Sequence, residues 1–197
     1  MRLLDWSHLK KSLSVPMKIG LVMILVFAIQ ESFNLDFGIL GILPRKIYGL
    51  FGVFLTPFIH ASEFHLLSNL YPFLILSIVL YYFYDRIAGW VLVYGMLWTN
   101  ILVWCAGRPY LHIGSSGLVY MLAFFLMCFG FFRWKTKDLI VSIAVITIYG
   151  SMIFGVIPSM GRVSWESHLL GAAVGFVLAF YIARKNQIKA FALSSIS

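Results

Sequence analysis

Long apolar runs, separated by short clusters of charged residues, make up most of the chain. A helix needs about 20 predominantly apolar residues to cross the hydrocarbon core of a bilayer, and basic side chains at its ends can reach the headgroups. Six stretches meet this requirement: residues 19–30 (extended by Lys18 and by the turn to Phe33), 64–84, 87–107, 109–132, 139–161 and 167–183 (extended by Arg184 and Lys185). The pattern predicts an all-α polytopic membrane protein with six transmembrane helices.

A seventh apolar run, residues 47–62, is too short to span and contains Gly49, Gly52 and Pro57. We interpret it as an interfacial or half-inserted segment within one large loop, residues 34–63. Residues 1–15 are expected to form a short amphipathic helix at the membrane surface, and residues 186–197 a tail. The chain is thus interpreted as one membrane domain, residues 1–197.

The distribution of basic residues predicts the orientation of this domain. Six spans put both termini on one side, and basic residues favour the cytoplasmic side. Of the 15 basic residues, four fall in the loops on the other side (Arg45, Lys46, Arg108 and Arg162), which leaves eleven with the termini. We therefore expect cytoplasmic N and C termini.

Composition excludes other classes of protein. The chain is 61% hydrophobic and 11% charged, whereas soluble domains are about 45–50% apolar and about 25% charged. The net charge of +8 flanks the spans and therefore indicates topology, with no nucleic-acid partner. Cys105 and Cys128 lie in apolar runs without metal-ligand spacing, so neither a disulfide scaffold nor a cysteine-based zinc module is expected.

A few polar residues stand at the beginning of three predicted spans. His65 and Asn69 begin the second span, Ser116 the fourth and His168 the sixth. These spans run in the same direction from the outer face, so their first residues lie at a similar depth. Polar groups inside a bilayer are costly, and this grouping therefore indicates a functional site.

Small residues predict how two of these spans meet. The sixth span carries a stripe at every fourth position: Ser167, Gly171, Gly175, Ala179 and Ala183. The fourth span begins Gly114-Ser115-Ser116-Gly117, with Tyr120 one turn later. Small residues let helix backbones approach closely, which would bring the Ser116 hydroxyl near the His168 imidazole.

This grouping predicts nucleophilic acyl transfer. Serine needs a base to take its proton, and a charged His168 near the bilayer would cost about 2.5–3.5 kcal/mol, which favours the neutral base. The Ser116 backbone N–H, the Asn69 amide and the His65 ring are candidate donors to the oxyanion. The nearest acid is Glu166, two residues from His168, and no Asp lies at an outer end of a span. The pattern favours a Ser-His dyad.

Other interpretations of these residues stay open. The histidines and Asn69 are also typical of hydrogen bonds between packed helices. A zinc site from His60, His65 and His168 is an alternative, although the HExxH spacing is absent. For the protein as a whole, a second alternative is a non-catalytic membrane protein that binds client helices. A channel or transporter is less favoured, because the four longest runs contain no charged residue.

The combined pattern resembles the signature of rhomboid intramembrane serine proteases. The matching residues are Ser116 in Gly-Ser-Ser-Gly, His168 followed by Leu-Leu-Gly171 and then Gly175, and His65 with Asn69. The resemblance extends from residue 1 to about residue 185, and is greatest to the compact six-helix bacterial type without an appended soluble domain.

The resemblance implies roles for individual residues. Ser116 would be the nucleophile, His168 the base, and His65, Asn69 and the Ser116 N–H the oxyanion hole, with Tyr120 packed on the histidine. It further implies a half-embedded first loop near residues 47–62, a lateral gate near residues 139–157 and a capping loop at residues 158–166.

The resemblance also implies an activity. The protein would be a hydrolase, a serine endopeptidase that cleaves transmembrane segments of other membrane proteins near the outer face of a bacterial inner membrane. Its partners would be these substrates and membrane lipids, and it would need no cofactor. Three features depart from the family pattern: Ser167 replaces an Ala, Val163 replaces a Gly, and the first loop lacks a Trp-Arg pair.

Overall fold

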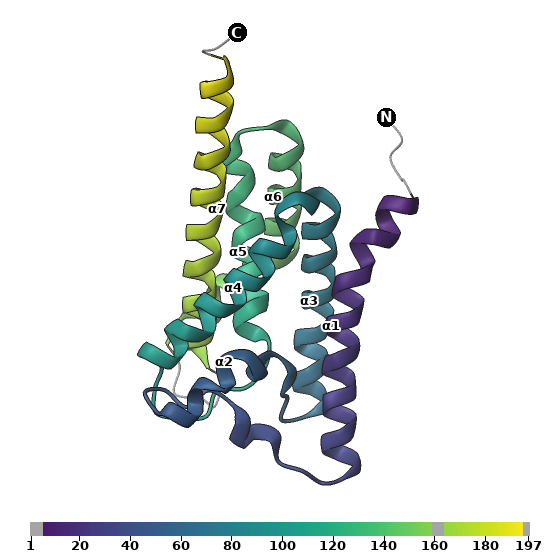
Figure 1. Cartoon of the computed structure of the whole chain (residues 1–197), viewed down its shortest axis with the longest axis vertical. Helices are drawn as coiled ribbons and strands as arrows, with labels where there is room; N and C mark the ends of the chain where they lie inside the picture. The colour runs from purple at the N-terminus through teal and green to yellow at the C-terminus, as the bar shows by residue number, and fades with distance from the viewer. Residues whose placement is uncertain (1–5, 159–163, 195–197) are drawn as a thin grey trace.

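A computed structural model describes residues 6–158 and 164–194 of the chain, with the backbone alone for residues 186–194. Within these residues, six helical segments are long and apolar enough to cross a membrane, which confirms the predicted all-α polytopic bundle (Figure 1). They are α1 (Trp6–Ser32), α3 (Glu63–Phe83), α4 (Asp85–Ala106), α5 (Ser116–Arg133), α6 (Thr136–Tyr149) continued by the 3₁₀ helix η4 (Gly150–Val156), and α7 (Trp165–Ser194).

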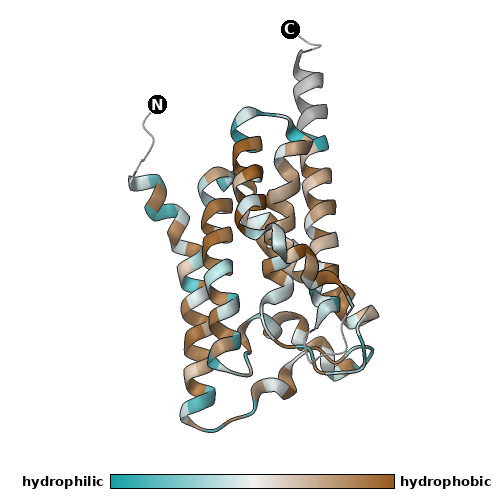
Figure 2. Cartoon of the chain, turned by 180° about the vertical axis from the view of Figure 1, so that it is seen from behind, coloured by the Kyte–Doolittle hydropathy of each residue, from teal (hydrophilic) through white to brown (hydrophobic). Residues whose placement is uncertain are grey.

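Helix α5 is the centre of the bundle. It contacts α3, α4, α6 and α7, and most of its residues are buried. Helices α1 and α6 leave most of their apolar side chains at the surface. Figure 2 shows that apolar residues make up most of the length of the helices. Lipid can cover such a surface, so the arrangement is that of a multi-pass membrane protein.

The contact between α5 and α7 is made through glycines. A Cβ atom on Gly171 would overlap the carbonyl oxygen of Gly117, and one on Gly175 would overlap that of Met121. The two backbones therefore touch, which residues with larger side chains would prevent. Because Gly117 and Gly171 lie near the beginnings of their helices, this contact holds Ser116 and His168 at the same end of the bundle.

The segment before α5 is not helical. The fourth apolar run begins at residue 109, and the helix begins at Ser116, the residue predicted to begin this span. In the preceding segment, Ile42 and His112 form an antiparallel bridge, and the Thr56 hydroxyl donates to the His112 carbonyl at 3.1 Å. The Gly114 N–H donates to the Thr56 carbonyl at 3.0 Å. The first loop thus pairs with the segment that leads into Ser116.

That loop contains four short helices, none long enough to span. They are η1 (Phe37–Leu40), η2 (Ile47–Leu50), α2 (Gly52–Leu55) and η3 (Thr56–Phe58). Contacts with α4 hold the loop: the Asn100 amide donates to the Val53 carbonyl at 2.7 Å, and Arg45 donates to the Gly107 carbonyl at 2.9 Å. In this chain, these bonds anchor a first loop that lacks the family's Trp-Arg pair.

Helix α1 also differs from the prediction. The separate surface helix expected at residues 1–15 is wrong for residues 6–15, because α1 runs unbroken from Trp6 through Pro16 to Ser32. Residues 1–5 lie outside the described residues. Pro16 lacks the N–H that would donate to the Ser12 carbonyl one turn earlier, and the Ser12 hydroxyl itself donates to the His8 carbonyl at 2.9 Å. Helix α1 begins, and α7 ends, at the end of the bundle opposite the first loop (Figure 1).

The glycine contact predicts the effect of one methyl group. Gly171→Ala should lower the free energy of unfolding by about 1–3 kcal/mol, because its Cβ would overlap backbone that cannot move independently. Gly89→Ala on α4 is the matched control, since its Cβ would meet only the Tyr81 hydroxyl at 3.9 Å. Unfolding in mixed detergent micelles measures both, and equal stability of the two variants would contradict the proposed contact.

Candidate active site

A cavity of about 1010 Å³ opens at the end of the bundle where α3, α5 and α7 begin. The five polar or aromatic residues to which the resemblance assigns roles all line it: His65, Asn69, Ser116, Tyr120 and His168. His60 and Glu166, which the sequence also offers, are not among its lining residues. Three segments that are far apart in the chain therefore contribute to one cavity.

The ring of His168 is held on two sides. Its Nδ1 lies 2.9 Å from the Gly155 carbonyl oxygen. A carbonyl can only accept, so Nδ1 carries the proton and Nε2 of the neutral ring has a free lone pair. The Tyr120 ring stacks on the imidazole, with 4.1 Å between centroids and 6° between planes. In this orientation, Nε2 is the ring nitrogen that can accept a proton.

The partner at Nδ1 is not the acid that the sequence offers. Glu166 binds Arg108 through both carboxylate oxygens and is buried there. The Gly155 carbonyl of η4 orients His168 instead, a contact that sequence reasoning missed because a backbone carbonyl has no residue signature. The feature of the sequence that could have indicated this contact is Gly155 itself. A Cβ atom at this position would overlap the Tyr120 hydroxyl, so only a glycine lets η4 approach the site this closely.

Ser116 is the first residue of α5 and follows Gly114 and Ser115. Its backbone N–H is among the first four of the helix, which have no partner within the helix. In the part of the chain that the structure describes, no hydrogen bond joins the Ser116 hydroxyl to His168. Catalytic hydrogen bonds are often long without substrate and tighten in the complex, so this geometry is compatible with proton transfer.

Two side-chain donors meet beside Gly114. The His65 Nδ1 accepts from the Ala61 N–H at 3.4 Å, which leaves the proton on Nε2. That Nε2 lies 2.6 Å, and the Asn69 Nδ2 3.7 Å, from the point where a Cβ of Gly114 would stand. Gly114 also has a φ of +98°. Only glycine suits this position, because a side chain would be strained and would displace His65.

Comparison with known proteins identifies the family of the chain. Residues 47–185 match the Rhomboid domain. The chain belongs to the rhomboid family. Members of this family are generally intramembrane serine proteases.

The curated relatives of this rhomboid are mycobacterial. An uncharacterized protein of Mycobacterium tuberculosis is 32% identical over 164 aligned positions, which cover 75% of this chain and 65% of that protein. One from Mycobacterium bovis has the same figures, and one from Mycobacterium leprae is 33% identical with 62% of its length covered. The rhomboid thus spans 62–65% of the length of the curated relatives it matches.

His60 lies behind the two donors. Its ring meets His65 edge-on at 5.1 Å between centroids, and its Nε2 is 3.5 Å from the Ser115 hydroxyl. Burial, and secondly the neighbouring His65, lower the pKa of His60 to about 4. Among the described residues, no three His, Cys, Asp or Glu side chains are grouped so that they could hold a metal ion.

The lowered pKa of His60 predicts how the stability of the protein depends on pH. Below its ordinary pKa of 6.5, His60 takes up a proton in the unfolded chain but stays neutral in the fold down to about pH 4. The unfolded state therefore binds more protons, and acidification from pH 7.5 to 4.5 should remove about 2–3 kcal/mol of stability through this residue.

Unfolding in mixed micelles at the two pH values measures this loss for the wild type and for His60→Gln. The variant cannot titrate at this position, so its stability should decrease less on acidification. An equal decrease in both proteins would show that His60 is not the group responsible.

Proposed function

We propose that this rhomboid is an intramembrane serine endopeptidase that uses a Ser116–His168 dyad. The observation that carries the proposal is the cavity shared by these two residues, in which His168 bonds a carbonyl through Nδ1 and leaves Nε2 as the base. The family, whose members are generally such proteases, supports the same activity.

The proposed reaction has two halves. The Ser116 oxygen attacks the carbonyl carbon of the scissile peptide while its proton passes to His168 Nε2. The tetrahedral oxyanion accepts hydrogen bonds from the Ser116 N–H, His65 Nε2 and Asn69 Nδ2. Collapse breaks the C–N bond, and the amine leaves with the proton from His168. Water then hydrolyses the acyl ester by the same route, and Ser116 regains its proton.

The substrates we propose are membrane-spanning segments of other proteins. In a helix, the peptide carbonyls are held in i to i−4 hydrogen bonds, so a substrate must unwind locally before Ser116 can attack. Segments with small or helix-breaking residues near their outer end meet this need at the lowest cost. In this proposal they enter from the lipid beside α6 and η4, where few residues are buried.

The proposed orientation follows the basic residues. Eleven of 15 fall in the segments that we place in the cytoplasm of a bacterium, which puts the cavity at the outer face of the inner membrane. The capping loop at residues 158–166 belongs to the same proposal, although residues 159–163, with Val163, lie outside the described residues.

A serine-reactive probe tests the nucleophile without a known substrate. We expect a fluorophosphonate to add one covalent label to the wild type, and none to Ser116→Ala or His168→Ala, because each removes half of the dyad. Intact mass measures the adduct. Ser14→Ala, which changes an exposed serine of α1, is the matched control and should label normally.

The alternative, a non-catalytic protein that binds client helices, gives the opposite result. Folded wild-type protein that stays unlabelled, or a label that persists in Ser116→Ala, would contradict the protease.

The oxyanion hole gives a second test. Asn69→Ala should lower the labelling rate by about tenfold to a thousandfold, because one donor to the developing charge is lost. Asn69→Asp keeps the size of the side chain but replaces the donors with a negative charge, and should be at least as slow. If Asn69 only packs between helices, the Asn69→Asp variant should be labelled faster than the Asn69→Ala variant.

A further inference from the structure

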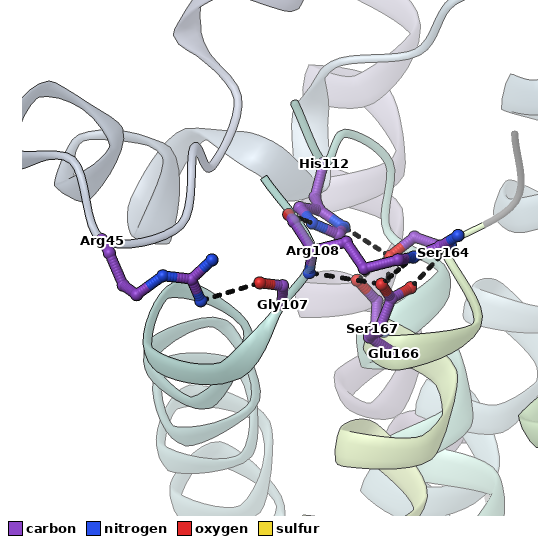
Figure 3. Close-up of polar contacts among 7 residues, drawn as sticks. All are labelled: Arg45, Gly107, Arg108, His112, Ser164, Glu166 and Ser167. Atoms are coloured by element: carbon purple, nitrogen blue, oxygen red, sulfur yellow. Dashed lines mark hydrogen bonds and ion pairs between the residues drawn. The ribbon is translucent and has the colours of Figure 1, made fainter. Parts of the chain in front are cut away.

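A polar network joins the beginning of α7 to residues 107–115, the segment that leads into Ser116 (Figure 3). Its members are Arg108 and His112 on that segment, and Ser164, Glu166 and Ser167 at the start of α7. Three of them, Arg108, His112 and Ser164, line the cavity of the proposed site. The network is therefore part of the cavity wall.

The strongest link is between Arg108 and Glu166. The guanidinium binds both carboxylate oxygens, through Nε to Oε1 and through Nη2 to Oε2 at 3.1 Å. The Arg108 backbone N–H donates to Oε1 as well, at 3.3 Å. Such a two-point contact fixes direction as well as distance. Because the Glu166 side chain is only 6% exposed, its charge depends on this partner.

A second link runs through His112. Its Nε2 faces the Arg108 carbonyl at 3.0 Å and must donate, so Nδ1 accepts from the Ser164 hydroxyl at 2.5 Å. Burial lowers the pKa of His112, in keeping with a neutral ring. The Ser167 hydroxyl then donates to the Ser164 oxygen at 2.7 Å. Ser167, which replaces the family's usual Ala, thus takes part in this network.

These links end close to the reacting groups. Glu166 is two residues before His168, and the His168 N–H donates to the Ser164 carbonyl at 3.4 Å. On the other side, the bridge between Ile42 and His112 fixes the segment that carries Arg108. The network therefore connects the backbones of both reacting residues by a route separate from the glycine contact of α5 and α7.

We propose that Glu166 is a positioning residue, which acts through Arg108 to hold His168 in reach of Ser116. The proposal rests on the protease function proposed above. A small displacement of a base from its nucleophile slows the reaction far more than it weakens binding. Loss of the pair should therefore change the rate at saturating probe and leave the affinity for the probe unchanged.

The test uses Glu166→Gln, which removes the charge and keeps the shape. We expect the limiting rate of fluorophosphonate labelling to decrease by about tenfold to a hundredfold, with the half-saturating probe concentration within about twofold of wild type. Arg108→Gln should behave alike, and the double variant should be no slower than either single one, because the two residues act as one unit. Arg108→Lys keeps the charge without the second contact and should be intermediate.

The matched control is Asp138→Asn. Asp138 is also buried and paired, with Arg133 at 3.3 Å, but this pair lies where α5 ends and α6 begins, at the end of the bundle away from the cavity. We expect this variant to lose stability and to label at the wild-type rate.

The outcomes separate the two proposals. Wild-type labelling that depends on Ser116, with Glu166→Gln as fast as wild type, would overturn the positioning role alone. The positioning role is also overturned if Glu166→Gln and Asp138→Asn lose equal stability and show the same decrease in labelling rate. It is likewise overturned if the decreases in rate caused by Glu166→Gln and Arg108→Gln add up in the double variant. Wild type that does not label, or that labels without Ser116, would overturn both proposals.

Discussion

The backbone contact between α5 and α7 is the constraint on which the rest of the structure depends. In a bilayer, apolar side chains gain little by leaving lipid for another helix, so close packing and polar bonds must hold the helices together. Gly117 and Gly171 remove the side chains that would keep the two helices apart. The contact lies one residue after Ser116 and three residues after His168, so any change in the distance between the two helices would also change the distance between these two residues.

Close packing alone would leave the polar end of the bundle without support. Buried polar groups in a membrane protein must bond within the protein, and here the loops provide the partners. Thr56 of the first loop bonds the backbone before α5, and η4 offers the Gly155 carbonyl to His168. The beginnings of α5 and α7 are therefore held by irregular or 3₁₀-helical segments, whereas their apolar lengths face other helices and lipid.

The sequence predicts the spans well, because a hydrophobic run of sufficient length has few other uses. It also predicts that His65, Ser116 and His168 share one level, since three spans with the same direction must begin on the same side. It does not predict the backbone pairing of the segment that precedes Ser116. His112 in that segment forms a bridge with Ile42, and this contact joins positions that are distant in the chain.

A backbone acceptor supplies the contact of His168 that the sequence does not show. The sequence favours a dyad without an acid on this histidine, and Glu166, the nearest acid in the chain, binds Arg108 in the structure. A carbonyl can orient the His168 ring without adding a charge to the site. A carboxylate on Nδ1 would be a buried charge, and it would itself need a buried partner. With Gly155 on Nδ1, the buried carboxylate of Glu166 is left to pair with Arg108, whose side chain is still one third exposed. The fold thus separates the group that selects the tautomer of His168 from the charged pair that fixes the position of its helix.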